Sequence, residues 1–192
     1  MGGPMSVNDP LPWIAQECEL IREAVSKDIP VIGHCLGAQL MSKALGGSVT
    51  KNPLKEIGWG SARADDSEIT RRWLGTEWRS ATDEFTVFQW HGETFSIPPG
   101  ATRILANDYC ANQAFVLGPN LAMQCHVEMT PEMIARWCMS WHEEVTGLRV
   151  LQNPLPGSVQ TPEEMQREAA THLPTMRRLA DQLYSVWIAG LR

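Results

Sequence analysis

The segment that most constrains the fold is a cysteine turn flanked by glycines, Gly-His-Cys-Leu-Gly, at residues 33–37. An apolar run at 29–32 precedes it and predicts a buried strand, and residues 38–45 behind it predict a helix that ends at two glycines. A strand, a sharp turn between glycines and a helix form the context of a nucleophile elbow, here with cysteine where hydrolases carry serine. The turn therefore predicts an α/β fold with Cys35 at a strand–helix junction.

The predicted position of Cys35 also favours a reactive thiol. At the start of a helix, unpaired N–H groups and the helix dipole stabilise a thiolate. Side chains at Gly33 or Gly37 would hinder the tight turn or the approach of strand and helix. The alternative is a buried structural cysteine in a glycine-rich turn, so the sequence must supply partners before Cys35 can be assigned chemistry.

Composition limits the classes of function. The chain has 192 residues and a net charge of −6, so it lacks the basic surface that nucleic acid or an anionic membrane would require. No apolar stretch approaches the roughly 20 residues of a membrane span. Its five cysteines form no Cys-x-x-Cys pair, which argues against zinc or a disulfide framework and for a reducing, cytoplasmic setting. We expect one domain over residues 1–192, with no metal.

Periodicity and turn signals predict strands that alternate with helices, typical of an α/β protein with a largely parallel sheet and an antiparallel appendage. Capping signals open two late helices at Pro131 and Pro162, the second kinked or broken near Pro174. The other expected helices cover 12–27, 38–45 and 68–74, and the expected strands cover 29–32, 48–50, 56–63, 86–90, 102–106, 113–117 and 121–125, the last two joined by a turn at 118–120.

A thiol nucleophile needs a base, and the base needs an orienting group. His126 leaves an apolar strand just before a helix, and open α/β sheets place their chemistry at such strand ends. Glu128 is two residues further on, so both side chains point to one side of an extended chain. The alternative is a half-exposed His–Glu pair at a strand end. Of the other histidines, His142 and His172 are expected in solvent and His34 in a packing role.

A tetrahedral intermediate also needs hydrogen-bond donors. The backbone N–H of Leu36, which follows the nucleophile, is one candidate. Gly3, in the turn Gly2–Pro4, is the candidate for the second, because a glycine brings a bare amide close to a substrate. The alternative for this turn is a disordered terminus.

Four stretches resemble motifs of the class I (triad) glutamine amidotransferases, and most closely the stand-alone branch labelled GMP-synthase-like. Residues 2–9 are similar to the oxyanion-strand motif and residues 30–40 to the nucleophile motif. Residues 89–93 with 98–101 are similar to the His-Gly-Asp segment, and residues 124–128 to the Gln-Phe-His-Pro-Glu segment, although Glu93 and Val127 depart from the usual Asp and Pro.

The resemblance implies a doubly wound, flavodoxin-like sheet and a triad of Cys35, His126 and Glu128. It implies hydrolysis of the glutamine side-chain amide through a γ-glutamyl thioester, with Gly3 and Leu36 at the oxyanion and no cofactor. By family position Gln39 would help to bind glutamine. The residues expected near the α-amino and carboxylate groups of the substrate are Gln89, Trp90 and His91.

The resemblance also leaves alternatives. Family members carry a strand–helix–strand unit ahead of the Gly-Gly-Pro motif, so the chain is expected to be N-terminally incomplete. No synthase domain follows in this sequence, so a separate synthase would be the partner that uses the ammonia. The same thioester chemistry would serve a γ-glutamyl peptidase or hydrolase, and an inactive truncated homologue is the third alternative.

Overall fold

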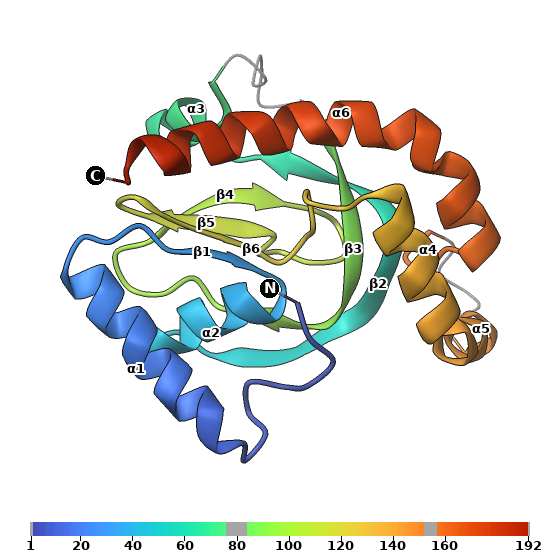
Figure 1. Ribbon diagram of the computed structural model, residues 1–192, viewed down its shortest axis with the longest axis horizontal. Helices are drawn as coiled ribbons and strands as arrows, with labels where there is room; N and C mark the ends of the chain where they lie inside the picture. The colour runs from blue at the N-terminus through green and yellow to red at the C-terminus, as the bar shows by residue number, and fades with distance from the viewer. Residues whose placement is uncertain (1, 76–83, 152–156, 192) are drawn as a thin grey trace.

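The computed structural model describes residues 2–75, 84–151 and 157–191, and arranges them as a sheet with helices on both sides (Figure 1). The helices are α1 (Pro12–Ser26), α2 (Leu36–Ala44), α3 (Glu68–Leu74), α4 (Pro131–Ser140), α5 (His142–Leu151) and α6 (Pro162–Ala189). The strands are β1 (Ile32–His34), β2 (Val49–Ala64), β3 (Glu84–Phe95), β4 (Thr102–Ala106), β5 (Ala114–Leu117) and β6 (Asn120–Met123).

The sheet has the strand order β1-β6-β5-β4-β2-β3, with β1 at one edge. The predicted α/β class is confirmed, but the balance of strand directions differs from the expected one. Among the described strands only β1 and β6 pair in parallel, and the other neighbours are antiparallel. Short connections explain this, because the links between β4 and β5 and between β5 and β6 cannot hold the crossover that parallel neighbours need.

The strand that leads to the cysteine turn lies later in the chain than the apolar run suggested. It covers Ile32–His34, and Ile29 is exposed. Strand pairing starts where β6 begins. The Leu121 N–H donates to the Val31 carbonyl, and the Val31 N–H donates to the side-chain Oδ1 of Asn120. Register with β6, not hydrophobicity, therefore sets the start of β1.

Strands β2 and β3 form one long, curved ribbon (Figure 1). The sequence predicted separate segments at 48–50 and 56–63, but β2 joins them through a register shift between Lys51 and Glu56. Pro53 lies within this shift, where a missing N–H costs no ladder hydrogen bond. β3 likewise continues past Trp90 to Phe95, so it carries His91 and Gly92 within a strand.

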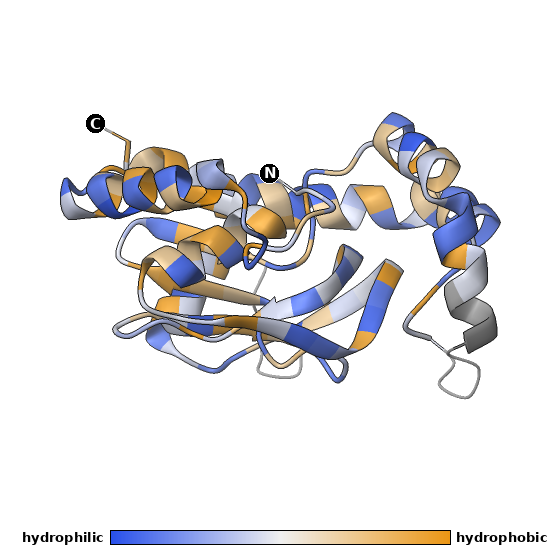
Figure 2. Cartoon of the chain, turned by 90° about the horizontal axis from the view of Figure 1, so that it is seen from below, coloured by the Kyte–Doolittle hydropathy of each residue, from blue (hydrophilic) through white to orange (hydrophobic). Residues whose placement is uncertain are grey.

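The sheet is buried on both faces. Successive residues of its central strands belong to two different hydrophobic clusters, one on each face. In β5, Phe115 packs with α1 and α2, whereas Ala114 and Val116 belong to the larger cluster with α3, α4 and α6. β6 alternates in the same way. The helices contain both apolar and polar residues, as the mixed colouring of Figure 2 shows. In α1, for example, the buried residues Ile14, Cys18 and Ile21 recur at helical spacing, so that helix can cover the sheet and face solvent.

The predicted helix starts are confirmed by their caps. Thr130 Oγ1 accepts from the Met133 N–H at 3.2 Å, and Thr161 forms a reciprocal capping box with Glu164. Pro174, however, does not break α6, which runs as one curved helix (Figure 1). Leu173 and Met176 on either side are buried in the larger core, and this packing offsets the lost N–H.

No helix in the described parts of the chain is long and apolar enough to cross a membrane.

Candidate active site

Cys35 sits at the turn between β1 and α2, in a strained backbone conformation. Its φ and ψ angles are 49° and −110°, a positive φ that side chains other than glycine rarely adopt. The Cys35 N–H donates to the Met123 carbonyl of β6 at 2.8 Å, which ties the turn to the parallel neighbour of β1. Such strain is characteristic of functional turns, and Cys35 here is the N-cap residue of α2.

Gly33 allows this turn to close. A Cβ added there would lie 2.6 Å from the carbonyl carbon of Gly37 and 2.8 Å from the Ala38 nitrogen, both backbone atoms that cannot rotate away. The close approach of strand and helix therefore requires glycine at position 33.

Gly33→Ala is expected to lower the free energy of unfolding by about 2 kcal/mol, as overpacking does. Gly147→Ala is the matched control, because a Cβ on that helical glycine meets nothing within 4 Å, and it should not destabilise the protein. Urea unfolding of both variants measures the difference. Equal unfolding midpoints for Gly33→Ala and wild type would contradict the packing argument.

His126 and Glu128 follow β6 and lie in direct contact. His126 is held by reciprocal backbone hydrogen bonds with Phe88 of β3, at 2.8 and 2.9 Å. Its Nδ1 lies 2.6 Å from Glu128 Oε1. The rings of His126 and Trp137 meet edge to face, with centroids 5.0 Å apart. With Nδ1 directed to the carboxylate, Nε2 is the atom available to a reactant.

The thiol and the imidazole meet across the turn. Both side chains border the same point, because a Cβ on Gly2 would lie 3.6 Å from the Cys35 Cβ and 3.7 Å from His126 Nε2. Burial alone would lower the pKa of His126, but the charge and hydrogen bond of Glu128, together with the neighbouring Cys35, outweigh it and raise the pKa to about 10. Burial alone would raise the pKa of Glu128. The charge and the hydrogen bond of His126 outweigh this effect and lower the pKa to about 2. The arrangement favours a charged imidazolium beside the Glu128 carboxylate.

The N-terminal glycines lie against this pair. A Cβ on Gly2 would be 3.1 Å from Cε1 of His126 and 3.6 Å from the Cys35 Cβ. A Cβ on Gly3 would be 2.8 Å from Leu36 Cδ2. Bare backbone therefore borders the thiol on this side, next to Leu36, whose N–H belongs to the first turn of α2 and has no partner within the helix.

Gln39 and Trp90 border the same region from α2 and β3. The Cys35 Sγ lies 3.8 Å from the Trp90 carbonyl oxygen. Both N–H donors of Gln39 are engaged, through Nε2, with the Glu93 carbonyl at 3.3 Å and Gln124 Oε1 at 3.2 Å. These contacts fix the amide orientation, so Gln39 presents its Oε1 as an acceptor.

Gln89 and His91 have their side chains on the other face of β3, because successive residues of a strand alternate. His91 Nε2 lies 3.0 Å from Glu56 Oε2, and its Nδ1 lies 3.0 Å from the Glu93 carbonyl. Gln89 lines a cavity of about 80 Å³ together with Glu56. The described contacts of His91 are thus with Glu56 and with the Glu93 carbonyl, which also accepts from Gln39. The expectation that Gln89 and His91 lie near the α-amino and carboxylate groups of the substrate stays a prediction.

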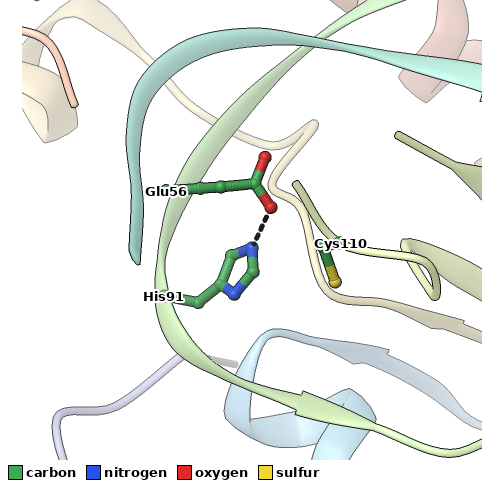
Figure 3. A group of neighbouring side chains, drawn as sticks. All are labelled: Glu56, His91 and Cys110. Carbon is green, nitrogen blue, oxygen red and sulfur yellow. Dashed lines mark ion pairs between the residues drawn. The ribbon is translucent and has the colours of Figure 1, made fainter. Parts of the chain in front are cut away.

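Glu56, His91 and Cys110 form a buried group of metal-ligand residue types (Figure 3). Its hydrogen bonds describe a polar network instead. The Glu56 carboxylate already accepts from Asn107 Nδ2 at 2.6 Å and Gln113 Nε2 at 3.0 Å. The Cys110 thiol donates to a backbone carbonyl, and burial raises its pKa, which favours a neutral thiol over the thiolate that a metal requires.

The other three histidines differ in their exposure to solvent. His142 is exposed, as expected, whereas His172 is half-buried with its ring 5.1 Å from that of Trp59. His34, expected to pack, is buried between Glu128 and Tyr184. No motif in the chain points to Tyr184, which lies on α6, 150 positions away from His34.

Comparison with known proteins gives a consistent family. The family model "Glutamine amidotransferase class-I" matches residues 1–136. The putative glutamine amidotransferase-like protein YfeJ of Salmonella typhimurium is 32% identical over 139 residues, which are 69% of this chain and 56% of that protein. A glutamine-hydrolyzing GMP synthase subunit of Sulfurisphaera tokodaii is 34% identical over 134 residues, 67% of this chain and 64% of that protein. The chain thus spans less than two thirds of the length of these relatives.

Solved structures agree. A glutamine amido transferase from Methylobacillus flagellatus superposes with a TM-score of 0.91 at 45% identity, over 100% of this chain and 75% of that chain. One from Thermotoga maritima gives a TM-score of 0.82 at 29% identity, over 97% and 75%. With the fold, the elbow and the matched residues in agreement, the chain belongs to the class-I glutamine amidotransferase family.

Proposed function

We propose that this protein hydrolyses the side-chain amide of glutamine to glutamate and ammonia through a γ-glutamyl thioester on Cys35. The observation that carries the proposal is the grouping of the three side chains: Cys35 Cβ and His126 Nε2 lie 3.6 and 3.7 Å from the position of a Cβ on Gly2, and His126 Nδ1 lies 2.6 Å from Glu128 Oε1. A nucleophile, a base and an orienting carboxylate in this order match the requirements of covalent acyl transfer. Membership of the family supports glutamine as the substrate.

In the first half-reaction the Cys35 thiolate attacks the amide carbonyl carbon, and the C=O electron pair moves to oxygen. The N–H groups of Gly3 and Leu36 are the proposed donors to this oxyanion. The C–N bond then breaks, and His126 gives its Nε2 proton to the leaving nitrogen. Ammonia departs, and Cys35 carries the γ-glutamyl group as a thioester.

In the second half-reaction neutral His126 takes a proton from water, and the resulting hydroxide attacks the thioester carbonyl. The C–S bond breaks, and the thiolate of Cys35 and the imidazolium of His126 are restored. Glu128 stays ionised throughout and stabilises the imidazolium that forms in each cycle. The balance is one glutamine and one water in, one glutamate and one ammonia out.

Gln39 and Trp90 are the proposed contacts for the substrate. Gln39 Oε1, with its amide held by Glu93 and Gln124, would accept from the α-ammonium group. Trp90 is half-buried and its backbone carbonyl lies 3.8 Å from the thiol, so its side chain is proposed as an apolar wall of the site. Gln89 and His91 stay the residues predicted near the α-amino and carboxylate groups.

Mass spectrometry of protein quenched during turnover tests the proposal. With glutamine, we expect a γ-glutamyl adduct on the peptide that contains Cys35, together with release of ammonia. A γ-glutamyl dipeptide in place of glutamine separates the alternative, because a γ-glutamyl hydrolase would form the adduct faster from the peptide. Absence of the adduct and of ammonia with either substrate would leave the inactive homologue as the conclusion.

The proposal extends to a partner protein and to the cellular compartment. The similarity to a GMP synthase subunit supports delivery of the ammonia to a separate synthase. The five cysteines are free in the structure, which supports a reducing, cytoplasmic setting.

A further inference from the structure

Glu93 of β3 connects two parts of the proposed site. Its backbone carbonyl accepts from Gln39 Nε2 at 3.3 Å, and its side-chain Oε1 accepts from the Ser6 hydroxyl at 3.0 Å. Gln39 is a proposed substrate contact, and Ser6 comes three residues after Gly3, the proposed donor to the oxyanion. Glu93 is itself held in the sheet by pairing with Lys51 of β2, so one fixed strand residue contacts both parts.

The hydroxyl of Ser6 uses its proton and a lone pair in two different bonds. It accepts from the Asn8 N–H at 3.1 Å and donates to the Glu93 carboxylate, which offers acceptors only. A hydrogen bond to a carboxylate is stronger than one between neutral groups. Ser6 and Glu93 are also only partly exposed, which limits competition from water. The bond can therefore hold two segments that lie 87 positions apart.

The turn before Ser6 has little else to hold it. Residues 2–4 are exposed, and within the described parts of the chain residues 2–5 form no hydrogen bond. A Cβ on Gly3 would nevertheless lie 2.8 Å from Leu36 Cδ2, so this backbone passes close to the residue that carries the other proposed oxyanion donor. The hydrogen-bonded anchor nearest to Gly3 is thus Ser6.

The chain that follows Ser6 is held by α2 and β2. Val7 is buried in the core with α1 and α2, and Lys43 Nζ of α2 donates to its carbonyl at 2.5 Å. Asn8 Nδ2 donates to the Val49 carbonyl of β2 at 3.0 Å. The bond of Ser6 adds β3 to these anchors, so the glycine turn extends from a point that a helix and two strands fix.

We propose that Ser6 and Glu93 are positioning residues: their hydrogen bond holds the glycine turn so that the Gly3 N–H points at the oxyanion that forms when Cys35 attacks. The inference rests on the proposed function, because that oxyanion exists only if Cys35 attacks an amide. The bond acts through the turn and touches no reacting atom. Its loss should therefore weaken binding of the transition state and spare binding of the substrate.

Ser6→Ala is expected to lower kcat for glutamine about tenfold, the effect of losing one hydrogen bond to a charged group, with KM nearly unchanged. Removal of an oxyanion donor costs about 10²- to 10³-fold in kcat, and here the donor remains but is misplaced. Ser26→Ala is the matched control. It removes an exposed hydroxyl at the end of α1, which donates to the Glu23 carbonyl at 2.8 Å, and should leave kcat unchanged.

Two variants of Glu93 test the other half of the pair. Glu93→Gln keeps a side-chain oxygen that can accept from the Ser6 hydroxyl, so it should keep most of the wild-type kcat. Glu93→Leu removes the acceptor and should match Ser6→Ala. The double variant with both Ser6→Ala and Glu93→Leu should be no slower than either single variant, because the two residues act as one unit. Urea unfolding shows whether each variant is folded.

The rate of Cys35 alkylation by iodoacetamide as a function of pH provides a readout that needs no turnover. The proposed partner of the thiol is His126, which the Ser6–Glu93 bond does not contact. Ser6→Ala should therefore keep the wild-type midpoint of the alkylation profile while its kcat falls. A shifted midpoint would show that the bond acts on the thiol and would overturn the inference.

Each outcome decides between the two proposals. If the wild type releases no ammonia from glutamine and forms no adduct on Cys35, the proposed function fails and this inference with it. If the wild type turns over, the inference alone fails when Ser6→Ala keeps the wild-type kcat, when KM rises as much as kcat falls, or when the two losses multiply in the double variant. Should Ser6→Ala not fold, Glu93→Gln must keep most of the activity and Glu93→Leu must lose it.

Discussion

Cys35→Ser is expected to lower kcat for glutamine hydrolysis by about 10⁴-fold or more, the size of effect seen when a catalytic nucleophile is removed. Serine keeps the shape of the side chain, so the strained turn at Cys35 and its hydrogen bond to Met123 should persist. The hydroxyl, however, is a far weaker acid than the thiol, and the neighbouring imidazolium cannot ionise it. Ammonia release under saturating glutamine measures the loss.

Cys18→Ala is the control for this experiment. Cys18 is also buried, but it lies in the core between α1 and α2, where burial raises its pKa, and it should behave as a small apolar residue. We expect near wild-type kcat and a modest loss of stability. Turnover by Cys35→Ser within tenfold of the wild type, with folding intact, would contradict the role of Cys35 as nucleophile.

Glu128→Gln is expected to lower kcat by about 10³- to 10⁴-fold, as loss of the orienting carboxylate does in related triads. The Glu128 charge is what raises the pKa of His126 to about 10 against the effect of burial. With an amide in its place, burial dominates and the pKa of His126 falls. The imidazolium that protonates the leaving ammonia is then lost at a lower pH, so the activity profile moves toward acid. Activity measured from about pH 5 to 10 tests both effects.

The pH dependence of the unfolding free energy should also reflect the pairing of His126 with Glu128. The raised pKa of His126 contributes stability that is present below its unfolded value of 6.5 and is lost as the pH rises through about 10. The lowered pKa of Glu128 contributes stability above 4.5 that is lost as the pH falls through about 2. Glu128→Gln should therefore flatten the decline of unfolding free energy on the alkaline side. Glu19→Gln, at an exposed carboxylate of α1, should leave the pH dependence of activity and of unfolding free energy unchanged.

Local chemistry made the elbow predictable. Glycines around a cysteine, a strand before it and a helix behind it are constraints between neighbours in the chain, and Gly33 proved to be in backbone contact with Gly37. The caps at Thr130 and Thr161 were predictable for the same reason. The division into one domain over residues 1–192 stays a prediction.

Strand ends and side-chain faces were less predictable. The start of β1 is set by hydrogen bonds to Asn120 and Leu121, which the apolar run at 29–32 cannot reveal. The motif locates His91 in the chain, but it does not reveal that Nε2 of this residue lies 3.0 Å from Glu56 Oε2. A motif fixes the position of a residue in the chain, whereas pairing between strands fixes the direction of its side chain.

The amino-acid order by itself determined the family, the turn that presents Cys35 and the pairing of His126 with Glu128 two residues later, because each depends on contacts between near neighbours. Only the tertiary structure decided that His126 lies beside Cys35, that His91 contacts Glu56, and that Tyr184 reaches His34 from α6. Those contacts join residues far apart in the chain, and they exist only once β6 has paired with β1 and α6 has packed across the sheet.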